Sequence, residues 1–213
     1  MSAEPGLSTE RALMKKHGGL LVGIDEVGRG ALAGPVTVGG IRIRQECDAA
    51  PVGVNDSKKL SARSREGLAP RIEKWADAWA IVHIPAVVID DIGIMAALTI
   101  GAREVAAALL PTGMGVVLLD GNRDFVSEVG AAHPLQRWVV VTEKKADETC
   151  ASVAAASILA KVARDAVMVQ LHAHAPEYGW QSNKGYGSAA HRIAIRASGS
   201  TSWHRRTWRL LSD

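Results

Sequence analysis

The chain has 213 residues, 47% of them hydrophobic and 22% charged, which is ordinary globular usage and enough for one sizeable α/β domain. Its formal net charge of +3 and sequence pI near 9.0 permit a polyanionic partner without requiring one. Two cysteines, Cys47 and Cys150, exclude a disulfide framework, and no secretory signal or membrane-length apolar stretch is present, so we expect a soluble cytoplasmic protein with no membrane partner.

The first nineteen residues contain Pro5, Gly6 and a polar mixture. Such a composition predicts a poorly ordered leader or a loose first helix at 1–19, ahead of a single domain at 20–213. Nothing in the leader suggests chemistry.

Hydrophobic periodicity and turn residues predict the remaining elements in chain order. We expect strand 20–26, strand 36–43, a helix from Ser61 towards Trp75, strand 79–84, one long or two consecutive helices at 87–110, strand 115–120, strand 138–141, helix 150–172, and helix 188–196. The short link between the first two strands favours an antiparallel hairpin. Pro70 predicts that its helix is broken or short, and the chain beyond about 174 predicts a C-terminal helical region.

Asp25 and Glu26 stand where the first apolar strand ends, just before a turn containing Gly28, Arg29 and Gly30. One interpretation is a solvated pair at a sheet edge. The other is a divalent metal with a phosphodiester, because buried carboxylates need a cation and the turn offers close backbone approach and a guanidinium. Successive strand residues point to opposite faces, so sharing one ion requires a bend or bulge at Glu26.

Two further carboxylates follow strands, Asp120 at the end of 115–120 and Asp147 after 138–141. Each alone is more typical of a cap or a surface charge. Together with Asp25 and Glu26 they supply the hard oxygen ligands that Mg²⁺ or Mn²⁺ prefers, and two such ions support an in-line phosphoryl displacement.

Polar loops carry Lys58, Lys59 and Lys184, and Tyr186 lies between two glycines. The lysines are consistent with either a solvated face or phosphate contacts. Tyr186 either packs a loop or is presented to stack on a sugar or to bond a 2′-hydroxyl, the group that distinguishes RNA from DNA.

Six motifs follow one another in register from about Leu20 to Trp208. They are Gly-Ile-Asp-Glu-Val-Gly-Arg-Gly at 23–30, Ala-Gly-Pro at 33–35, Asp-Ser-Lys-Lys-Leu-Ser at 56–61, Leu-Asp-Gly at 119–121, Ala-Ala-Ser-Ile-Leu-Ala-Lys-Val-Ala-Arg-Asp at 155–165, and Lys-Gly-Tyr-Gly at 184–187 with His191. Together they closely resemble ribonuclease HII over nearly the whole chain.

The resemblance implies a ribonuclease H-like α/β fold, with a five-stranded mixed β-sheet flanked by helices and a C-terminal helical extension. It implies a metal-dependent endoribonuclease that hydrolyses the RNA strand of RNA/DNA hybrids and cuts 5′ of single ribonucleotides embedded in duplex DNA, leaving a 5′-phosphate. Ribonucleotide excision repair and primer RNA removal would be its tasks. The implied cofactor is Mn²⁺ or Mg²⁺, two ions with substrate bound, in a monomer without an obligate protein partner.

The resemblance also assigns roles to individual residues. The catalytic and metal-binding acids would be Asp25, Glu26, Asp120 and Asp147, the first three as direct ligands. The substrate contacts would be Gly28, Arg29, Gly30, Ser57, Lys58, Lys184 and Tyr186. This chain departs from the family in having Ala146 where glycine is usual, and His-Arg-Arg-Thr-Trp at 204–208 in place of a Ser-Phe ending.

Three alternatives compete with this interpretation. Ribonuclease HIII shares the chemistry but has an extra N-terminal domain, for which the leader leaves no room. A catalytically silent nucleic-acid-binding module is disfavoured because four carboxylates without metal would repel phosphate. A structural Ca²⁺ domain is disfavoured because scattered carboxylates do not form a calcium loop.

Overall fold

The computed structural model describes residues 4–111, 114–127 and 137–211. The elements in chain order are α1 (Ser8–His17), β1 (Leu21–Val27), β2 (Val36–Ile43), η1 (Ser57–Lys59), α2 (Ala62–Trp75), β3 (Ala78–Ile84), α3 (Ala86–Ile92), α4 (Ile94–Leu109), β4 (Met114–Asp120), β5 (Arg137–Glu143), α5 (Ala146–Thr149), α6 (Ala151–His174), η2 (Pro176–Tyr178), α7 (Trp180–Asn183) and α8 (Ala189–Ser198).

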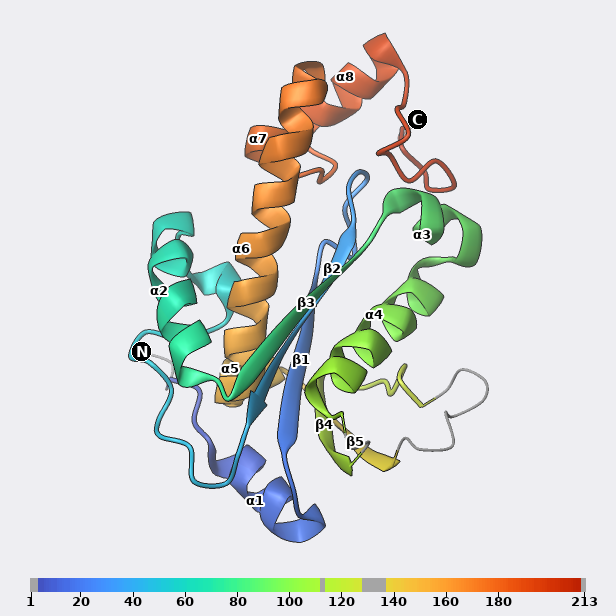
Figure 1. The fold of residues 1–213 in the computed structure, drawn as a ribbon. Coiled ribbons are helices and arrows are strands. Elements are labelled where there is room, and N and C mark those ends of the chain that lie inside the picture. The colour runs from blue at the N-terminus through green and yellow to red at the C-terminus, as the bar shows by residue number, and fades with distance from the viewer. Residues whose placement is uncertain (1–3, 112–113, 128–136, 212–213) are drawn as a thin grey trace.

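The five strands form one mixed sheet in the order β3-β2-β1-β4-β5 (Figure 1). β1 and β2 form the predicted antiparallel hairpin, and β2 pairs antiparallel with β3. β4 runs parallel to both β1 and β5, so the carboxyl ends of these three strands share one edge. The predicted five-stranded mixed sheet with flanking helices is confirmed.

Helices cover both faces of the sheet, with α6 and then α2 on one face and α4 on the other (Figure 1). Strand side chains alternate between two cores: Leu21 and Leu118 pack on the α6 side, whereas Val22 and Leu119 pack on the α4 side. The hydrophobic effect of burying both faces is what fixes this register, since a one-residue slip would exchange the two sets.

The first half of α6 is built from small residues and lies close against the sheet. A Cβ added to Gly39 in β2 would lie 2.8 Å from the Ala156 carbonyl oxygen, so only glycine allows this approach. The close packing carries α6 across the strand that bears Asp25 and past the loops that follow it.

One expectation about the helices is corrected. Pro70 neither breaks nor shortens α2, because it lies on the exposed face, where water can bond the carbonyl that its missing N–H leaves unpaired. Ser61 caps this helix as expected, its side chain accepting from the Ser64 N–H. Of the two alternatives expected at 87–110, one long helix or two consecutive ones, the structure has two, α3 and α4, separated by Gly93 at φ 80°.

Of the two expectations for the leader, a poorly ordered segment or a first helix, the structure has the helix, since residues 8–17 form α1. Leu7 and Met14 are buried in the core on the α6 side. The fully buried carboxylate of Glu10 accepts hydrogen bonds from the Ser152 N–H and Oγ, each at 3.0 Å, and so caps α6 from outside the helix. The leader thus stabilises the start of the longest helix.

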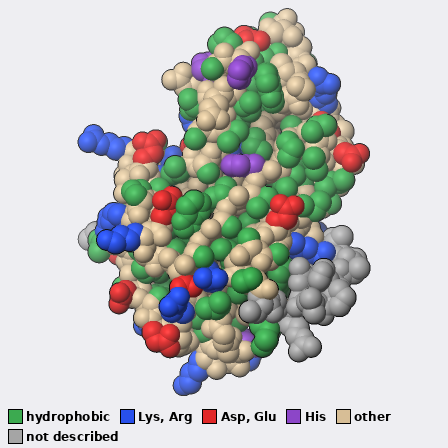
Figure 2. All heavy atoms as spheres, viewed as in Figure 1, with side chains coloured by type: hydrophobic (Ala, Val, Ile, Leu, Met, Phe, Trp, Pro, Cys, Tyr) green, Lys and Arg blue, Asp and Glu red, His purple; other side chains and the backbone are tan. Residues whose placement is uncertain are grey.

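Acidic and basic side chains are interspersed on the face shown in Figure 2. No single helix in the described ranges is long and apolar enough to cross a membrane, although α3 and α4 together, bent by 118°, pass the same test of length and composition.

The C-terminal region packs around two buried histidines, His191 and His204. His204 Nδ1 accepts from the Thr201 N–H at 3.0 Å, and the two Nε2 atoms are 3.2 Å apart. His191 Nε2 also accepts from the Trp180 indole N–H. This pattern suits two neutral rings, with the His204 Nε2–H donating to His191.

We expect the stability of the protein to fall as pH drops from about 6.5 to about 4. Burial, and then the charge of His191, lower the pKa of His204 from 6.5 to about 4. The unfolded chain therefore gains this proton first, and up to about 3 kcal/mol of unfolding free energy that is present above pH 6.5 is lost across the window. Urea unfolding across this range checks the prediction, with His204→Gln as the comparison. Equal pH slopes for the two proteins would contradict it.

Candidate active site

Asp25 and Asp120 come together because β1 and β4 are parallel neighbours. Ile24 pairs with Leu119, and the two aspartates occupy the next position on each strand. Strand alternation places both on the α6 side, with Leu21 and Leu118. Asp25 is 6% exposed, and its Oδ1 accepts from the Glu26 N–H at 2.8 Å.

Asp147 reaches the same edge from α5, the short helix between β5 and α6. Asp120 Oδ1 accepts from the Ala146 N–H at 2.8 Å and so anchors this helix. The left-handed backbone conformation at this turn falls on Lys145, at φ 58°. Ala146 is the first residue of α5, where an L-residue is unstrained, so the departure from the family's glycine creates no conformational conflict.

Glu26 does not share the face of Asp25. The β1–β2 ladder pairs residues one to one from Leu21 to Val27, so the bulge expected at Glu26 is absent from this ladder. Its side chain lies on the opposite face, where the Arg29 guanidinium is 3.5 Å away. Arg29 also reaches Met95 Sδ of α4, which fixes the turn on that side.

The carboxylates repel one another in a partly dehydrated site. Burial, and then the charges of Glu26 and Asp120, raise the pKa of Asp25 well above its usual range. Burial raises the pKa of Glu26, with Arg29 opposing and the charge of Asp120 adding to the rise. Burial and Asp120 likewise raise the pKa of Asp147. A cation bound here would therefore relieve an unfavourable concentration of negative charge.

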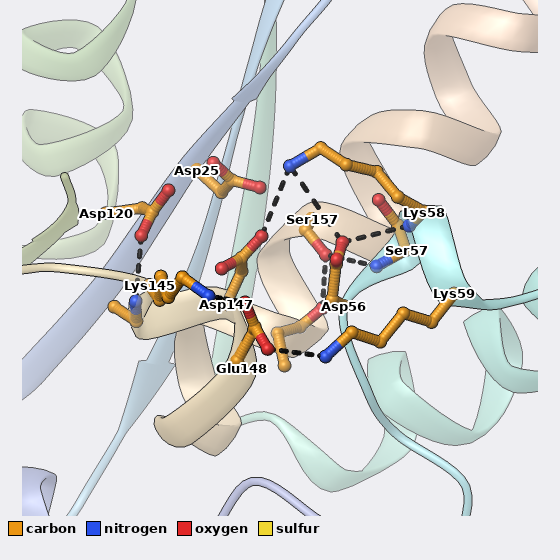
Figure 3. A network of polar contacts seen from close by, with 12 residues as sticks. Asp25, Asp56, Ser57, Lys58, Lys59, Asp120, Lys145, Asp147, Glu148 and Ser157 are labelled. Atoms are coloured by element: carbon orange, nitrogen blue, oxygen red, sulfur yellow. Dashed lines mark hydrogen bonds and ion pairs between the residues drawn. The ribbon is translucent and has the colours of Figure 1, made fainter. Parts of the chain in front are cut away.

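Lys58 is the ammonium group that approaches this cluster from the η1 loop. Its Nζ lies 3.3 Å from Asp147 Oδ2 and 3.9 Å from Asp56 Oδ1, and its side chain is 77% exposed (Figure 3). Asp56 caps η1 by accepting from the Lys58 N–H, and buried Ser57 donates its N–H to Ser157 Oγ of α6. Although burial lowers the pKa of Lys58, the charges of Asp147 and Asp25 raise it overall.

A cleft of about 590 Å³ opens beside Asp120 and Asp147. Lys58, Lys144 and Lys145 line it together with the acids, so its wall carries charges of both signs. Figure 3 shows the carboxylates of Asp25, Asp120 and Asp147 gathered on one side of the Lys58 amine.

The donor set fits a hard divalent cation. Carboxylate oxygens are the ligands that Mg²⁺ and Mn²⁺ prefer, and burial together with neighbouring acids makes the ionised forms of Asp25 and Asp147 unfavourable without a cation. Among the described residues no three acidic, His or Cys side chains are already close enough to hold an ion. The side chains would therefore have to draw together when an ion binds.

The glycine-rich turn and the Tyr186 loop lie side by side. The N–H groups of Leu32 and Ala33 both donate to the Gly185 carbonyl, at 2.8 and 3.2 Å. Tyr186 is 39% exposed and its ring lies 5.4 Å from Arg164 Cζ. Lys184 has a left-handed backbone (φ 51°) and donates its Nζ to the Gln181 carbonyl. The predicted substrate contacts of the two loops are thus neighbours. Arg29 of the glycine-rich turn also pairs with Glu26, next to Asp25 in the chain.

Comparison with known proteins decides the family. The model of the family described as Ribonuclease HII matches residues 22–211. The chain belongs to the ribonuclease HII family. It is 38% identical over 217 residues to the ribonuclease HII of Streptomyces avermitilis, an alignment covering 99% of this chain and 87% of that protein.

Solved structures agree on the fold. The ribonuclease HII of Archaeoglobus fulgidus, solved as a complex with PCNA, superposes with a TM-score of 0.69 at 29% identity, covering 91% of this chain and 97% of that one. Bst-RNase HIII in complex with Mn²⁺ superposes with a TM-score of 0.66 at 21% identity, covering 90% of this chain and 67% of that one. The ribonuclease H-like fold is confirmed, and the protein is a type 2 ribonuclease H that acts on RNA/DNA.

Two residues that bond the glycine-rich turn, Arg164 and Arg205, were not predicted as site residues from the sequence. Both are fully buried beneath the glycine-rich turn. Arg164 lies in the motif at 155–165, and an arginine among apolar helix residues is a signal for a buried polar contact. Arg205 lies in a terminal stretch that reads as basic with interleaved aromatics, which gave no such signal.

Proposed function

We propose that this ribonuclease HII cuts the phosphodiester on the 5′ side of a ribonucleotide, both within RNA/DNA hybrids and at single ribonucleotides in duplex DNA, leaving a 5′-phosphate. The observation that supports this most is the meeting of Asp25, Asp120 and Asp147 at the carboxyl edge of β1, β4 and β5. Repair of misincorporated ribonucleotides and removal of primer RNA are the cellular tasks that suit such a cut.

Asp25, Asp120 and Asp147 would hold divalent metal, and the Mn²⁺ complex of Bst-RNase HIII supports this choice of ion. Glu26 would serve as a fourth acid only after its side chain leaves Arg29 on the other face of β1. Bound Mn²⁺ or Mg²⁺ would supply Lewis-acid stabilisation of the phosphoryl oxygens and would activate water. The Lys58 side chain is exposed and paired with Asp147. Its ammonium group could therefore turn to a substrate phosphate bound at the cleft.

The glycine-rich turn and Tyr186 would recognise the ribonucleotide. Arg29 and Gly30 are exposed residues whose backbone N–H groups can donate to a 2′-hydroxyl oxygen, and the half-exposed Tyr186 ring can stack on the sugar. Ser57 and Lys184 would contribute more indirectly, since Ser57 is buried and the Lys184 ammonium is bonded to its own loop. A monomer acting without an obligate protein partner stays a prediction.

The test uses end-labelled duplexes incubated with the protein in Mn²⁺, in Mg²⁺ and in chelator. One duplex carries a single ribonucleotide, one is an RNA/DNA hybrid, and one is all DNA. We expect a metal-dependent nick 5′ of the ribonucleotide, cutting of the hybrid, and no cutting of DNA. Cutting of the hybrid alone would remove the repair role, and binding without cutting in any metal would overturn the proposal.

A further inference from the structure

Two buried guanidinium groups support the glycine-rich turn from below. Arg164 of α6 and Arg205 near the C-terminus are both 0% exposed. Within the described ranges neither forms an ion pair with a carboxylate, and the Arg205 guanidinium instead lies over the Trp208 ring at 4.7 Å. Burying a cation without an anionic partner is unfavourable. We therefore expect each arginine to make hydrogen bonds that an apolar side chain could not make.

Arg205 bonds the turn itself through three backbone carbonyls. It donates to Gly28 O at 2.6 Å, to Arg29 O at 2.7 Å and to Gly34 O at 3.3 Å. The rigid planar fork of arginine can hold several acceptors at fixed directions, which the single ammonium group of lysine cannot do.

These bonds determine where the neighbouring N–H groups point. A trans peptide is planar, and its C=O and N–H point in opposite directions. The Gly28 and Arg29 carbonyls are directed inward to Arg205, so the N–H groups of Arg29 and Gly30 are directed outward. Among the described residues neither N–H donates to another protein group, and both residues are exposed.

Arg164 connects the same turn to the Tyr186 loop. It donates to Pro35 O at 2.9 Å and Ala33 O at 3.1 Å on one side, and to Lys184 O at 2.9 Å on the other. Its guanidinium also lies against the Tyr186 ring. The two arginines together therefore fix the outward N–H groups and the tyrosine ring relative to each other.

We propose that Arg205, supported by Arg164, is a positioning residue for ribonucleotide selectivity. It holds the two peptides that follow Gly28 and Arg29 so that their N–H groups meet one 2′-hydroxyl at the cleaved junction. This role rests on the proposed function and adds to it a residue that does not touch the substrate. A lone ribonucleotide offers a single 2′-hydroxyl in a single register, whereas a run of ribonucleotides offers several, so loss of positioning should harm the lone ribonucleotide most.

The test compares wild type with Arg205→Lys on two duplexes, one with a single ribonucleotide and one with a run of ribonucleotides. We expect the ratio of kcat/KM on the first to kcat/KM on the second to fall about tenfold, the effect of one well-placed hydrogen bond. We also expect cuts within the run to spread over several phosphates, where wild type favours one. A purely structural role would lower both rates equally and leave the cut pattern unchanged.

Two further variants complete the experiment. Tyr178→Phe removes a buried hydrogen bond to Gly199 O in the same C-terminal region without touching the turn, and it should keep the wild-type ratio and cut pattern. If Arg205→Lys does not fold, Trp208→Leu removes the ring over Arg205 while leaving its hydrogen bonds, and a smaller shift of the same sign is expected.

The results separate the two proposals. An unchanged ratio and cut pattern in a folded Arg205 variant overturns the positioning role. Failure of wild type to cut either duplex overturns the proposed function instead.

Discussion

Asp25→Asn is expected to reduce cleavage of an RNA/DNA hybrid by about a thousandfold or more, the scale seen when charge stabilisation is removed from an active site. The asparagine keeps an oxygen for the Glu26 N–H, so the strand end retains its geometry. It loses the charge with which Asp25 would hold a metal ion beside Asp120. Product formation from a labelled hybrid measures the loss, and binding of the hybrid measured by fluorescence anisotropy should change little.

The same variant should be more stable than wild type at neutral pH in the absence of metal. The pKa of Asp25 is raised by burial and by neighbouring acids, so the folded state disfavours its ionised form. Above the ordinary pKa of an aspartate the unfolded chain loses this proton more readily than the folded protein does, so Asp25 lowers the unfolding free energy, and neutral Asn removes this cost. Asp165→Asn is a control, because Asp165 pairs with Lys161 and Arg65 and is not one of the acids that raise the pKa of Asp25. Cleavage within tenfold of wild type would contradict the assignment of Asp25.

Gly28→Ala is expected to lower the unfolding free energy by about 3 kcal/mol or more, as left-handed strain and overpacking combine. Gly28 has φ 85°, and a Cβ there would overlap the Arg164 guanidinium at Nε. Because Arg164 is also bonded to Pro35 and Lys184, it cannot move aside without breaking the link between the two loops. Unfolding in guanidinium chloride measures the loss of stability. The rate of hybrid cleavage should fall as well.

Gly30→Ala is the matched control within the same motif. A Cβ at Gly30 meets nothing within 4 Å, so the change in unfolding free energy should stay within about 0.5 kcal/mol. If the Gly30 N–H donates to the substrate, cleavage at a single ribonucleotide should still fall, because the added methyl group would crowd the bound substrate. Equal destabilisation by the two variants would show that Arg164 does not restrict Gly28.

The strands and the acidic residues could be predicted from sequence because their signals are local. The run at 115–120 is apolar until Asp120, and a carboxylate at the end of a buried strand stands out whatever the rest of the chain does. That Asp25 and Asp120 meet on one face depends only on parallel pairing and alternation, and the structure shows both.

What could not be predicted depends on contacts distant in sequence. Glu10 lies in an ordered helix, α1, because its carboxylate accepts hydrogen bonds from Ser152 at the start of α6. Pro70 was tolerated because of the face on which it lies. The bulge expected at Glu26 is absent from the β1–β2 ladder, and the Glu26 side chain lies beside Arg29 on the other side of the strand. Arg205 contacts a turn more than a hundred residues earlier, and no local pattern carries that information.

The most direct test of the central claim is the position of Mn²⁺ in crystals of the protein bound to the nicked product duplex, located by anomalous scattering. We predict Mn²⁺ within about 2.0–2.2 Å of carboxylate oxygens of Asp25 and Asp120, with Asp147 facing the same site. Mn²⁺ bound elsewhere on the chain, with none at these carboxylates in an active protein, would contradict the account.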